Sequence, residues 1–176
     1  MIDNLKKHNY LYLSIGSTIL MIFYLVFFLN KYSKSFSVEV GINSLGLTFF
    51  YTYEIVKDFF ESRTLEQLFY YRRFLQIWDP IFAISYTVMY SSWIIYFFTN
   101  KYYLLVLPLL VMIIDWLENY IELIMLESFI NSDILSPTLV LLGASINALR
   151  WLLFSAIYLL IIVGIIKGIK NYYAKR

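Results

Sequence analysis

Residues 112–122 read Met112-Ile113-Ile114-Asp115-Trp116-Leu117-Glu118-Asn119-Tyr120-Ile121-Glu122. An α-helix turns about 100° per residue, so polar side chains at positions i, i+3, i+4 and i+7 share one face. In this stretch they are Asp115, Glu118, Asn119 and Glu122. A charged side chain near the centre of a bilayer costs roughly 2.5–3.5 kcal/mol on insertion scales. The stretch therefore predicts a membrane helix whose polar face is turned toward protein or water.

The composition supports a membrane protein. The chain has 176 residues, of which 61% are hydrophobic and 15% charged, and its mean hydropathy is +0.69. These values exclude an ordinary soluble domain. The absence of cysteine excludes disulfides and thiolate catalysis, and a lone histidine, His8, has no partner histidine for a metal site, so no metal or cofactor is predicted. The net charge of +2 without a basic tract argues against a nucleic-acid partner.

Four apolar stretches have the length of a membrane-spanning helix, which is about 20 residues. They predict spans at about residues 10–29, 80–98, 104–127 and 138–166, within a single membrane domain over residues 1–176. The fold class is an all-α integral membrane protein, a bundle of four transmembrane helices. Ser14, Ser17 and Thr18 lie on one face of the first span, which we expect to pack against other helices. A cleaved signal peptide is the alternative for this stretch, but its apolar part is longer than a usual signal.

The segment at about residues 48–77, between the first two spans, is predicted to form amphipathic interfacial helices. One covers about residues 52–60, and Thr64 with Gln67 forms a capping box that opens the next. We expect their apolar sides to face lipid and their basic side chains to face phosphates. Asp79-Pro80 would then start the second span, with proline in the first turn and aspartate as the cap.

Counting residues from the turn between the third and fourth spans predicts an ion pair. Arg150 lies twelve residues after position 138, and Asp115 lies twelve residues before position 127. Each is about 18 Å from the turn at 1.5 Å per residue. Arg150 should therefore meet Asp115 or Glu118 near the middle of the membrane.

The remaining acids exceed what one arginine can pair. Glu118 and Glu122 should lie one and two turns nearer the surface, with Asp79 at the mouth of the polar column. A buried ion pair that only fixes helix register is the alternative. Three carboxylates against one guanidinium exceed that need, so the surplus acids are candidate proton donors, proton acceptors or cation ligands.

An aromatic stripe follows Asp79 along the second span, at Phe82, Tyr86, Tyr90 and Trp93. It is either core packing or the wall of a pocket. We predict Asp115 and Glu118 as the candidate catalytic pair, a proton donor and acceptor. The predicted ligand-binding residues are Asn119, Glu122, Arg150, Asp79, Tyr86, Tyr90, Trp116 and Asn147.

The basic residues favour one orientation. Those in the short flanks and tails lie on one side of the membrane: Lys6, Lys7, Lys101, Lys167, Lys170, Lys175 and Arg176. Short flanks count most in the positive-inside rule, so we expect a multi-pass protein of the cell membrane with both termini in the cytoplasm. Gly164 and Gly168 form a G-x-x-x-G at the membrane edge, a weak indication of a homo-oligomer.

Several short motifs resemble an uncharacterised family of small four-helix membrane proteins. They are Leu45-Gly46-Leu47-Thr48-Phe49-Phe50-Tyr51-Thr52, Tyr71-Arg72-Arg73, Asp79 with Tyr86, the Asp115-x-x-Glu118-Asn119 core, and a basic residue before Trp151. Members of that family often carry lysine at the position of Arg150, and a glycine before the arginine where this chain has Tyr71. The resemblance implies a shared polar site. The architecture is also similar to the EXPERA family of sterol isomerases and small-molecule-binding proteins, which implies a lipid or sterol-like ligand.

These observations predict a protein that binds a small lipophilic molecule or lipid in a buried acidic and aromatic site, and that is in contact with membrane lipids. Whether it also converts the ligand is left open by the sequence. The alternatives are proton or cation translocation and a non-catalytic scaffold whose charges are structural. The sequence has no G-x-S-x-G, no glycine-rich phosphate loop and no histidine pair, which argues against a hydrolase, kinase or haem protein.

Overall fold

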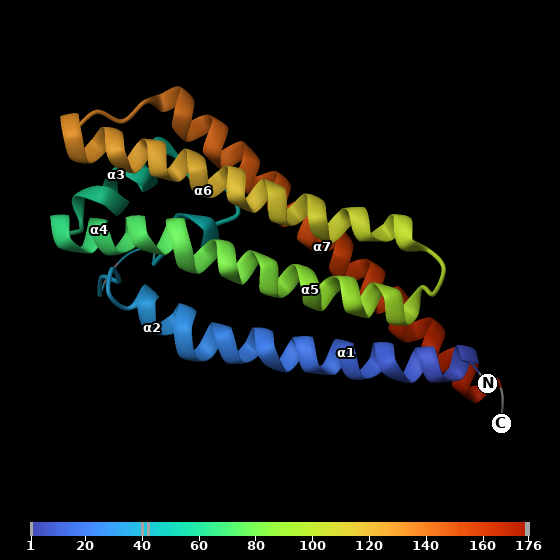
Figure 1. Cartoon of the computed structure of the whole chain (residues 1–176). Coiled ribbons are helices and arrows are strands. Elements are labelled where there is room, and N and C mark those ends of the chain that lie inside the picture. The colour runs from blue at the N-terminus through green and yellow to red at the C-terminus, as the bar shows by residue number, and fades with distance from the viewer. Residues whose placement is uncertain (1, 40, 42, 175–176) are drawn as a thin grey trace.

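The computed structural model describes residues 2–39, 41 and 43–174. Within these residues all regular structure is helical, and four helices are long and apolar enough to cross a membrane: His8–Ser33, Leu65–Phe97, Tyr102–Ser132 and Pro137–Lys170. The predicted all-α class and the number of long apolar helices are therefore confirmed. Figure 1 shows the two ends of the chain at one end of the bundle and α3 at the opposite end.

The elements follow one another along the chain. The α-helices are α1 (Ile2–Tyr24), α2 (Asn30–Ser33), α3 (Tyr53–Glu61), α4 (Leu65–Arg73), α5 (Asp79–Phe97), α6 (Val106–Ser132) and α7 (Pro137–Tyr173). Wide π turns at Leu25–Leu29 and Phe74–Trp78 join α1 to α2 and α4 to α5, and tighter 3-10 turns cover Leu45–Leu47 and Tyr102–Leu105.

Helix α1 packs along α5 through the hydroxyl face that the sequence predicts. The hydroxyls of Ser17 and Ser92 are 3.0 Å apart, and the indole N–H of Trp93 donates to the hydroxyl of Thr18 at 3.0 Å. Small hydroxyl side chains let two helices approach and bond without the driving force of water exclusion. The opposite face of α1 is apolar and exposed.

The second long helix does not begin at Asp79-Pro80. Helices α4 and α5 join through the π turn into one continuous helix, Leu65–Phe97, so the prediction that the second span starts at Asp79-Pro80 is wrong. Pro80 has no N–H to donate, and its ring would clash with the preceding turn of a regular α-helix. The turn directly before it is a wider π turn, in which the N–H of Asp79 donates to the carbonyl of Phe74. This wider turn lets the helix continue past the proline ring. The predicted capping box of Thr64 and Gln67 is confirmed, and it opens this long helix.

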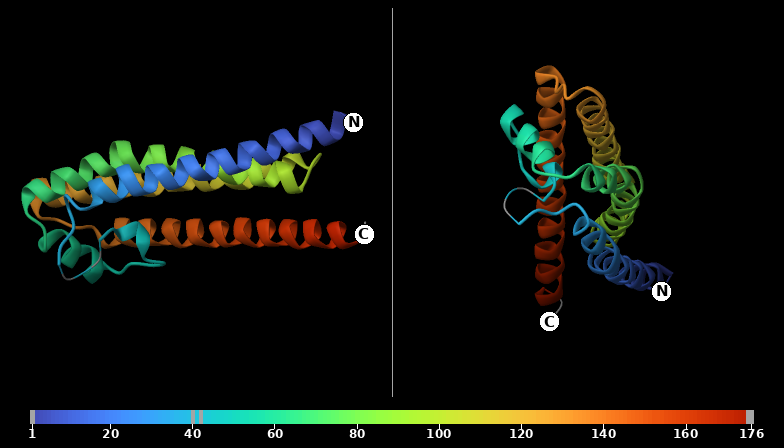
Figure 2. Two further views of the ribbon diagram at one scale, coloured as in Figure 1. Left: turned by 90° about the horizontal axis from the view of Figure 1, so that it is seen from below. Right: turned by 90° about the vertical axis from the view of Figure 1, so that its left-hand side faces the viewer.

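Helix α3 buries its apolar side in the protein. Val56, Phe59 and Phe60 are all buried, so the expectation that they face lipid is wrong. They pack into a core formed with α4, α6 and the irregular segment, by which we mean residues 34–39, 41 and 43–52. Figure 2 shows this part of the chain beside α7, at the end of the bundle far from the termini.

Arg63, just after α3, also points inward. Its Nε donates to the carbonyl of Phe36 at 2.8 Å, and its guanidinium lies 3.5 Å from the ring centre of Phe59. Burial lowers the pKa of Arg63 to about 10. This side chain therefore fastens the irregular segment to α3 instead of facing lipid phosphates as expected.

Candidate functional site

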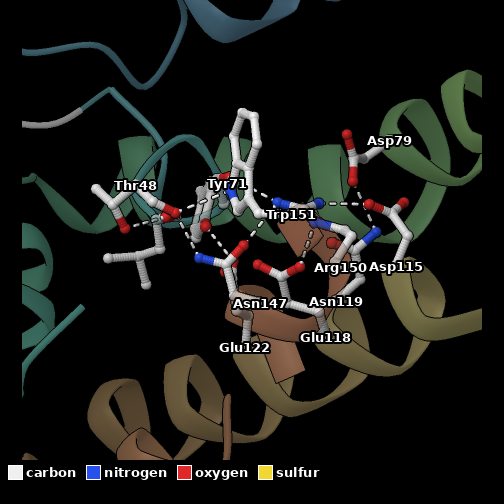
Figure 3. Close-up of polar contacts among 12 residues, drawn as sticks. Thr48, Tyr71, Asp79, Asp115, Glu118, Asn119, Glu122, Asn147, Arg150 and Trp151 are labelled. Atoms are coloured by element: carbon white, nitrogen blue, oxygen red, sulfur yellow. Dashed lines mark hydrogen bonds and ion pairs between the residues drawn. The ribbon is translucent and has the colours of Figure 1, made fainter. Parts of the chain in front are cut away.

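Arg150 forms the centre of the site. Its Nη1 pairs with Asp115 Oδ1, and its Nε lies 2.9 Å from Glu118 Oε2. All three side chains are buried, and they come from α6 and α7 (Figure 3). The ion pair predicted by counting residues is confirmed. It holds because helix rise per residue is nearly constant, so two helices that share a turn bring equally distant residues together.

We call seven buried or half-buried polar residues the polar centre. They are Asp79, Asp115, Glu118, Asn119, Glu122, Asn147 and Arg150. Arg150 lies thirteen residues after Pro137 and seventeen before Lys167, which corresponds to about 20 Å and about 25 Å along the helix. The polar centre thus lies near the middle of the apolar part of α7.

Asp79 joins the centre through α6. Asn119 Nδ2 donates to Asp79 Oδ2 at 2.8 Å, which places Asp79 level with Asn119 and not at the mouth of the column as expected. The reason is the continuous helix, because the fourteen residues from Leu65 carry the chain about 20 Å inward before Asp79. Asp79 does not cap the start of α5 as predicted, because Trp78 holds the N-cap position and makes no side-chain cap hydrogen bond.

Glu122 is held by a residue that sequence reasoning did not place in the site. The hydroxyl of Tyr71, on α4, donates to Glu122 Oε2, and both side chains are completely or almost completely buried. The sequence points to Tyr71 only through the Tyr71-Arg72-Arg73 motif of the family resemblance. Tyr71 faces inward because α4 continues the long helix instead of lying apart from the bundle.

The irregular segment enters the bundle and caps the polar centre. Arg150 Nη2 donates to the carbonyl of Gly46 at 2.6 Å and to Asn147 Oδ1 at 2.9 Å. Asn147 Nδ2 donates to the carbonyl of Thr48 at 2.6 Å, and the indole N–H of Trp151 is shared between the same two carbonyls. Buried backbone carbonyls need hydrogen-bond donors, and α7 supplies them here (Figure 3).

Gly46 is required by this close approach. A Cβ at position 46 would lie 3.0 Å from Arg150 Nη2 and 3.3 Å from Glu118 Oε1. Any larger residue at position 46 would push the segment away from Arg150 and stretch the hydrogen bond from its guanidinium to the carbonyl of residue 46. The 3-10 turn at Leu45–Leu47 therefore acts as a lid of backbone over the ion pair.

Several buried oxygens of the centre have no hydrogen-bond donor among the described residues. They are both carboxylate oxygens of Glu118, Oε1 of Glu122 and the hydroxyl of Tyr51, although Glu118 Oε2 is within ion-pair distance of Arg150. Tyr51 lies in the irregular segment, and burial together with the charges of Glu122 and Glu118 raises the pKa of its hydroxyl. It is therefore a neutral group near these acids, and in the sequence it stands out only as a member of the motif at residues 45–52.

Aromatic side chains flank the centre on the side of α5. Tyr86 and Tyr90 are buried; the ring of Tyr86 meets Phe154 edge to face at 5.1 Å, and the hydroxyl of Tyr90 donates to that of Tyr158 at 2.7 Å. These two members of the stripe predicted along α5 thus pack against α7, whereas Phe82 and Trp93 contact α1.

Trp116 does not line the site. Its side chain is 40% exposed on the outer surface, so the predicted place in the wall is wrong. It follows Asp115 directly, and neighbouring residues on a helix point about 100° apart. The indole that reaches the centre is Trp151, on α7.

The arrangement can hold or exchange protons and can offer hydrogen bonds to a ligand. Four carboxylates, those of Asp79, Asp115, Glu118 and Glu122, face a single guanidinium. Across the described parts of the chain, no group of three or more histidine, cysteine, aspartate or glutamate side chains is placed to hold a metal ion. The two likenesses noted in the sequence stay predictions. When the chain is compared with models of known protein families, with curated proteins and with solved structures, nothing matches it.

Proposed function

We propose that this chain is a multi-pass membrane protein whose polar centre binds the polar head of a small lipophilic molecule or lipid. The observation that carries the proposal is the set of buried oxygens without a donor among the described residues, on Glu118, Glu122 and Tyr51. A buried polar atom left without a partner costs about 1–3 kcal/mol, and native proteins keep few of them. A bound head group would supply the missing partners.

The surroundings of these atoms suit a lipophilic ligand. Tyr86, Tyr90 and Phe154 form an aromatic layer that continues from the polar centre along α5 and α7. Further along the same helices lies an apolar groove of about 450 Å³, lined in part by Trp93 and Ile161. A molecule with a polar head and a hydrocarbon body would match this arrangement, in which a polar centre is followed by an aromatic layer and an apolar groove.

The two central carboxylates have different surroundings, which suits proton transfer. Asp115 forms a charge-assisted hydrogen bond with Arg150, which stabilises its ionised form. Glu118 keeps one oxygen without any contact to a donor in the described chain. In the proposal Glu118 and Asp115 form the donor and acceptor pair for chemistry on the bound ligand, and Asn119 and Asn147 orient the charged groups.

Native mass spectrometry of the detergent-purified protein, followed by lipid extraction, tests the proposal. The native chain is compared with Glu118→Gln and with Glu127→Gln, a matched control. Glu127 pairs with Arg72 at 2.7 Å, away from the polar centre. We expect a co-purifying molecule that is present in the native chain and the control and lost in Glu118→Gln. A molecule retained in Glu118→Gln, or none in the native chain, would refute the proposal.

Proton passage is a second candidate, because three groups of polar contacts lie within two turns of one another along α6. Tyr71 contacts Glu122 on α6, Arg150 bridges Glu118 and Asp115, and Asn119 contacts Asp79. Acid chains of this kind carry protons in transporters. Proton flux into proteoliposomes that disappears in Glu122→Gln would favour passage over ligand binding. A purely structural network predicts that such neutral substitutions lower stability and change neither binding nor flux.

A further inference from the structure

Tyr51 occupies a place that packing alone does not explain. Its side chain is completely buried, yet its hydroxyl has no hydrogen-bond partner in the described part of the chain. Phenylalanine would fill the same volume without burying an unpaired hydroxyl. A buried tyrosine hydroxyl normally finds a partner.

The space for this hydroxyl depends on Gly143. A Cβ added at position 143 would overlap the Tyr51 hydroxyl, so only glycine on α7 lets the group reach this point. The phenol lies close enough to Glu122 and Glu118 for their charges to act on it. Each of these acids also has an Oε1 without a donor in the residues described. Three unpaired buried oxygens, one on the irregular segment and two on α6, thus lie in one neighbourhood.

We infer that Tyr51, Glu118 and Glu122 form the subsite for the ligand head, and that this head is a hydrogen-bond donor without negative charge, a hydroxyl or an ammonium. The inference rests on the proposed function and adds both a residue and a ligand class to it. The two carboxylates accept from the head, and the Tyr51 hydroxyl can donate or accept.

The charge of the surroundings excludes an anionic head. Three buried carboxylates and the half-buried Asp79 surround one guanidinium, which already pairs with Asp115 and Glu118 and donates to Gly46. A phosphate or carboxylate placed here would meet further negative charge and would find no free cation in the described centre. Both a hydroxyl and an ammonium bring donors, and an ammonium also offsets charge.

The experiment uses three probes of equal chain length that differ only in the head: dodecanol, dodecylamine and dodecanoate. Each is titrated against the native chain in phosphatidylcholine nanodiscs, and saturable shifts of the thermal unfolding midpoint give apparent affinities. The variant is Tyr51→Phe. The matched control is Tyr53→Phe, the same change two residues away at the start of α3.

We expect dodecanol or dodecylamine to stabilise the native chain saturably, and dodecanoate to cause no shift. Tyr51→Phe should bind the active probe about tenfold more weakly, as expected for the loss of one hydrogen bond, while Tyr53→Phe binds like the native chain. Without ligand, Tyr51→Phe should unfold no earlier than the native chain, because its hydroxyl makes no internal hydrogen bond in the described chain. This stability measurement separates lost binding from lost folding.

Three results would overturn the inference. Equal affinity of the native chain and Tyr51→Phe removes Tyr51 from the subsite. Dodecanoate binding that depends on Tyr51 contradicts the ligand class, and so does failure of both donor probes to bind. In each case a co-purified molecule that depends on Glu118 would leave the proposed function standing, so the two failures are distinguishable.

Discussion

Replacing Gly46 by alanine tests whether the irregular segment is held against Arg150 as tightly as the structure indicates. The added Cβ would lie 3.0 Å from Arg150 Nη2, which is closer than nearly all such contacts. The same guanidinium donates to the Gly46 carbonyl at 2.6 Å, so backing away from the methyl group stretches that bond. A hydrogen bond to a charged group contributes about 1.5–3 kcal/mol.

We therefore expect Gly46→Ala to lower the free energy of unfolding by about 2 kcal/mol, or about thirtyfold in the ratio of folded to unfolded protein. The assay is unfolding in mixed micelles with rising denaturing detergent, followed by tryptophan fluorescence. Gly16→Ala is the matched control, because its Cβ would have no described atom within 4 Å. It lies inside α1, where alanine is favoured over glycine by up to about 1 kcal/mol.

The two substitutions should thus have opposite signs. If Gly46→Ala is as stable as the native chain, the lid is not in contact with Arg150 and the description of the capped centre is wrong. A loss in Gly16→Ala of the same size would show that the assay reports a general effect of added methyl groups and not this contact.

Two further substitutions test the contacts around Glu122 and Tyr51. Tyr71→Phe removes the donor to Glu122 Oε2 and should lower the free energy of unfolding by about 1–3 kcal/mol, whereas unchanged stability in the same unfolding assay would contradict that hydrogen bond. Gly143→Ala should destabilise the chain because its Cβ overlaps the Tyr51 hydroxyl, and combining it with Tyr51→Phe should restore most of the loss. Additive losses in that double variant would show that the two residues are not in contact.

The parts of the fold that follow local geometry could be predicted from the sequence. The pairing of Arg150 with Asp115 follows from counting residues along two helices that share a turn, and the contact face of α1 follows from the spacing of Ser17 and Thr18. Both predictions need only the rise and the twist of an α-helix.

The parts that depend on distant contacts could not. Pro80 is a strong local signal for a helix start, yet a π turn, which has no reliable signal in the sequence, lets the helix continue past it. That error also misplaced Asp79 and left out Tyr71. The sequence of the irregular segment has no periodic pattern that would predict its burial. The carbonyls of Gly46 and Thr48 accept hydrogen bonds from side chains on α7 and not from residues near them in the sequence.

The contact between Gly46 and Arg150 joins positions that are 104 residues apart, and this separation sets an order for synthesis and insertion. The irregular segment emerges from the ribosome long before α7 exists. Until α7 is made, the carbonyls of Gly46 and Thr48 lack the donors that pair them in the finished protein, and the acids of α6 lack their cation. The contacts of Arg150 with Gly46, Asp115 and Glu118 can therefore form only after α7 has been made, whereas the Tyr71–Glu122 and Asn119–Asp79 contacts need no part of α7.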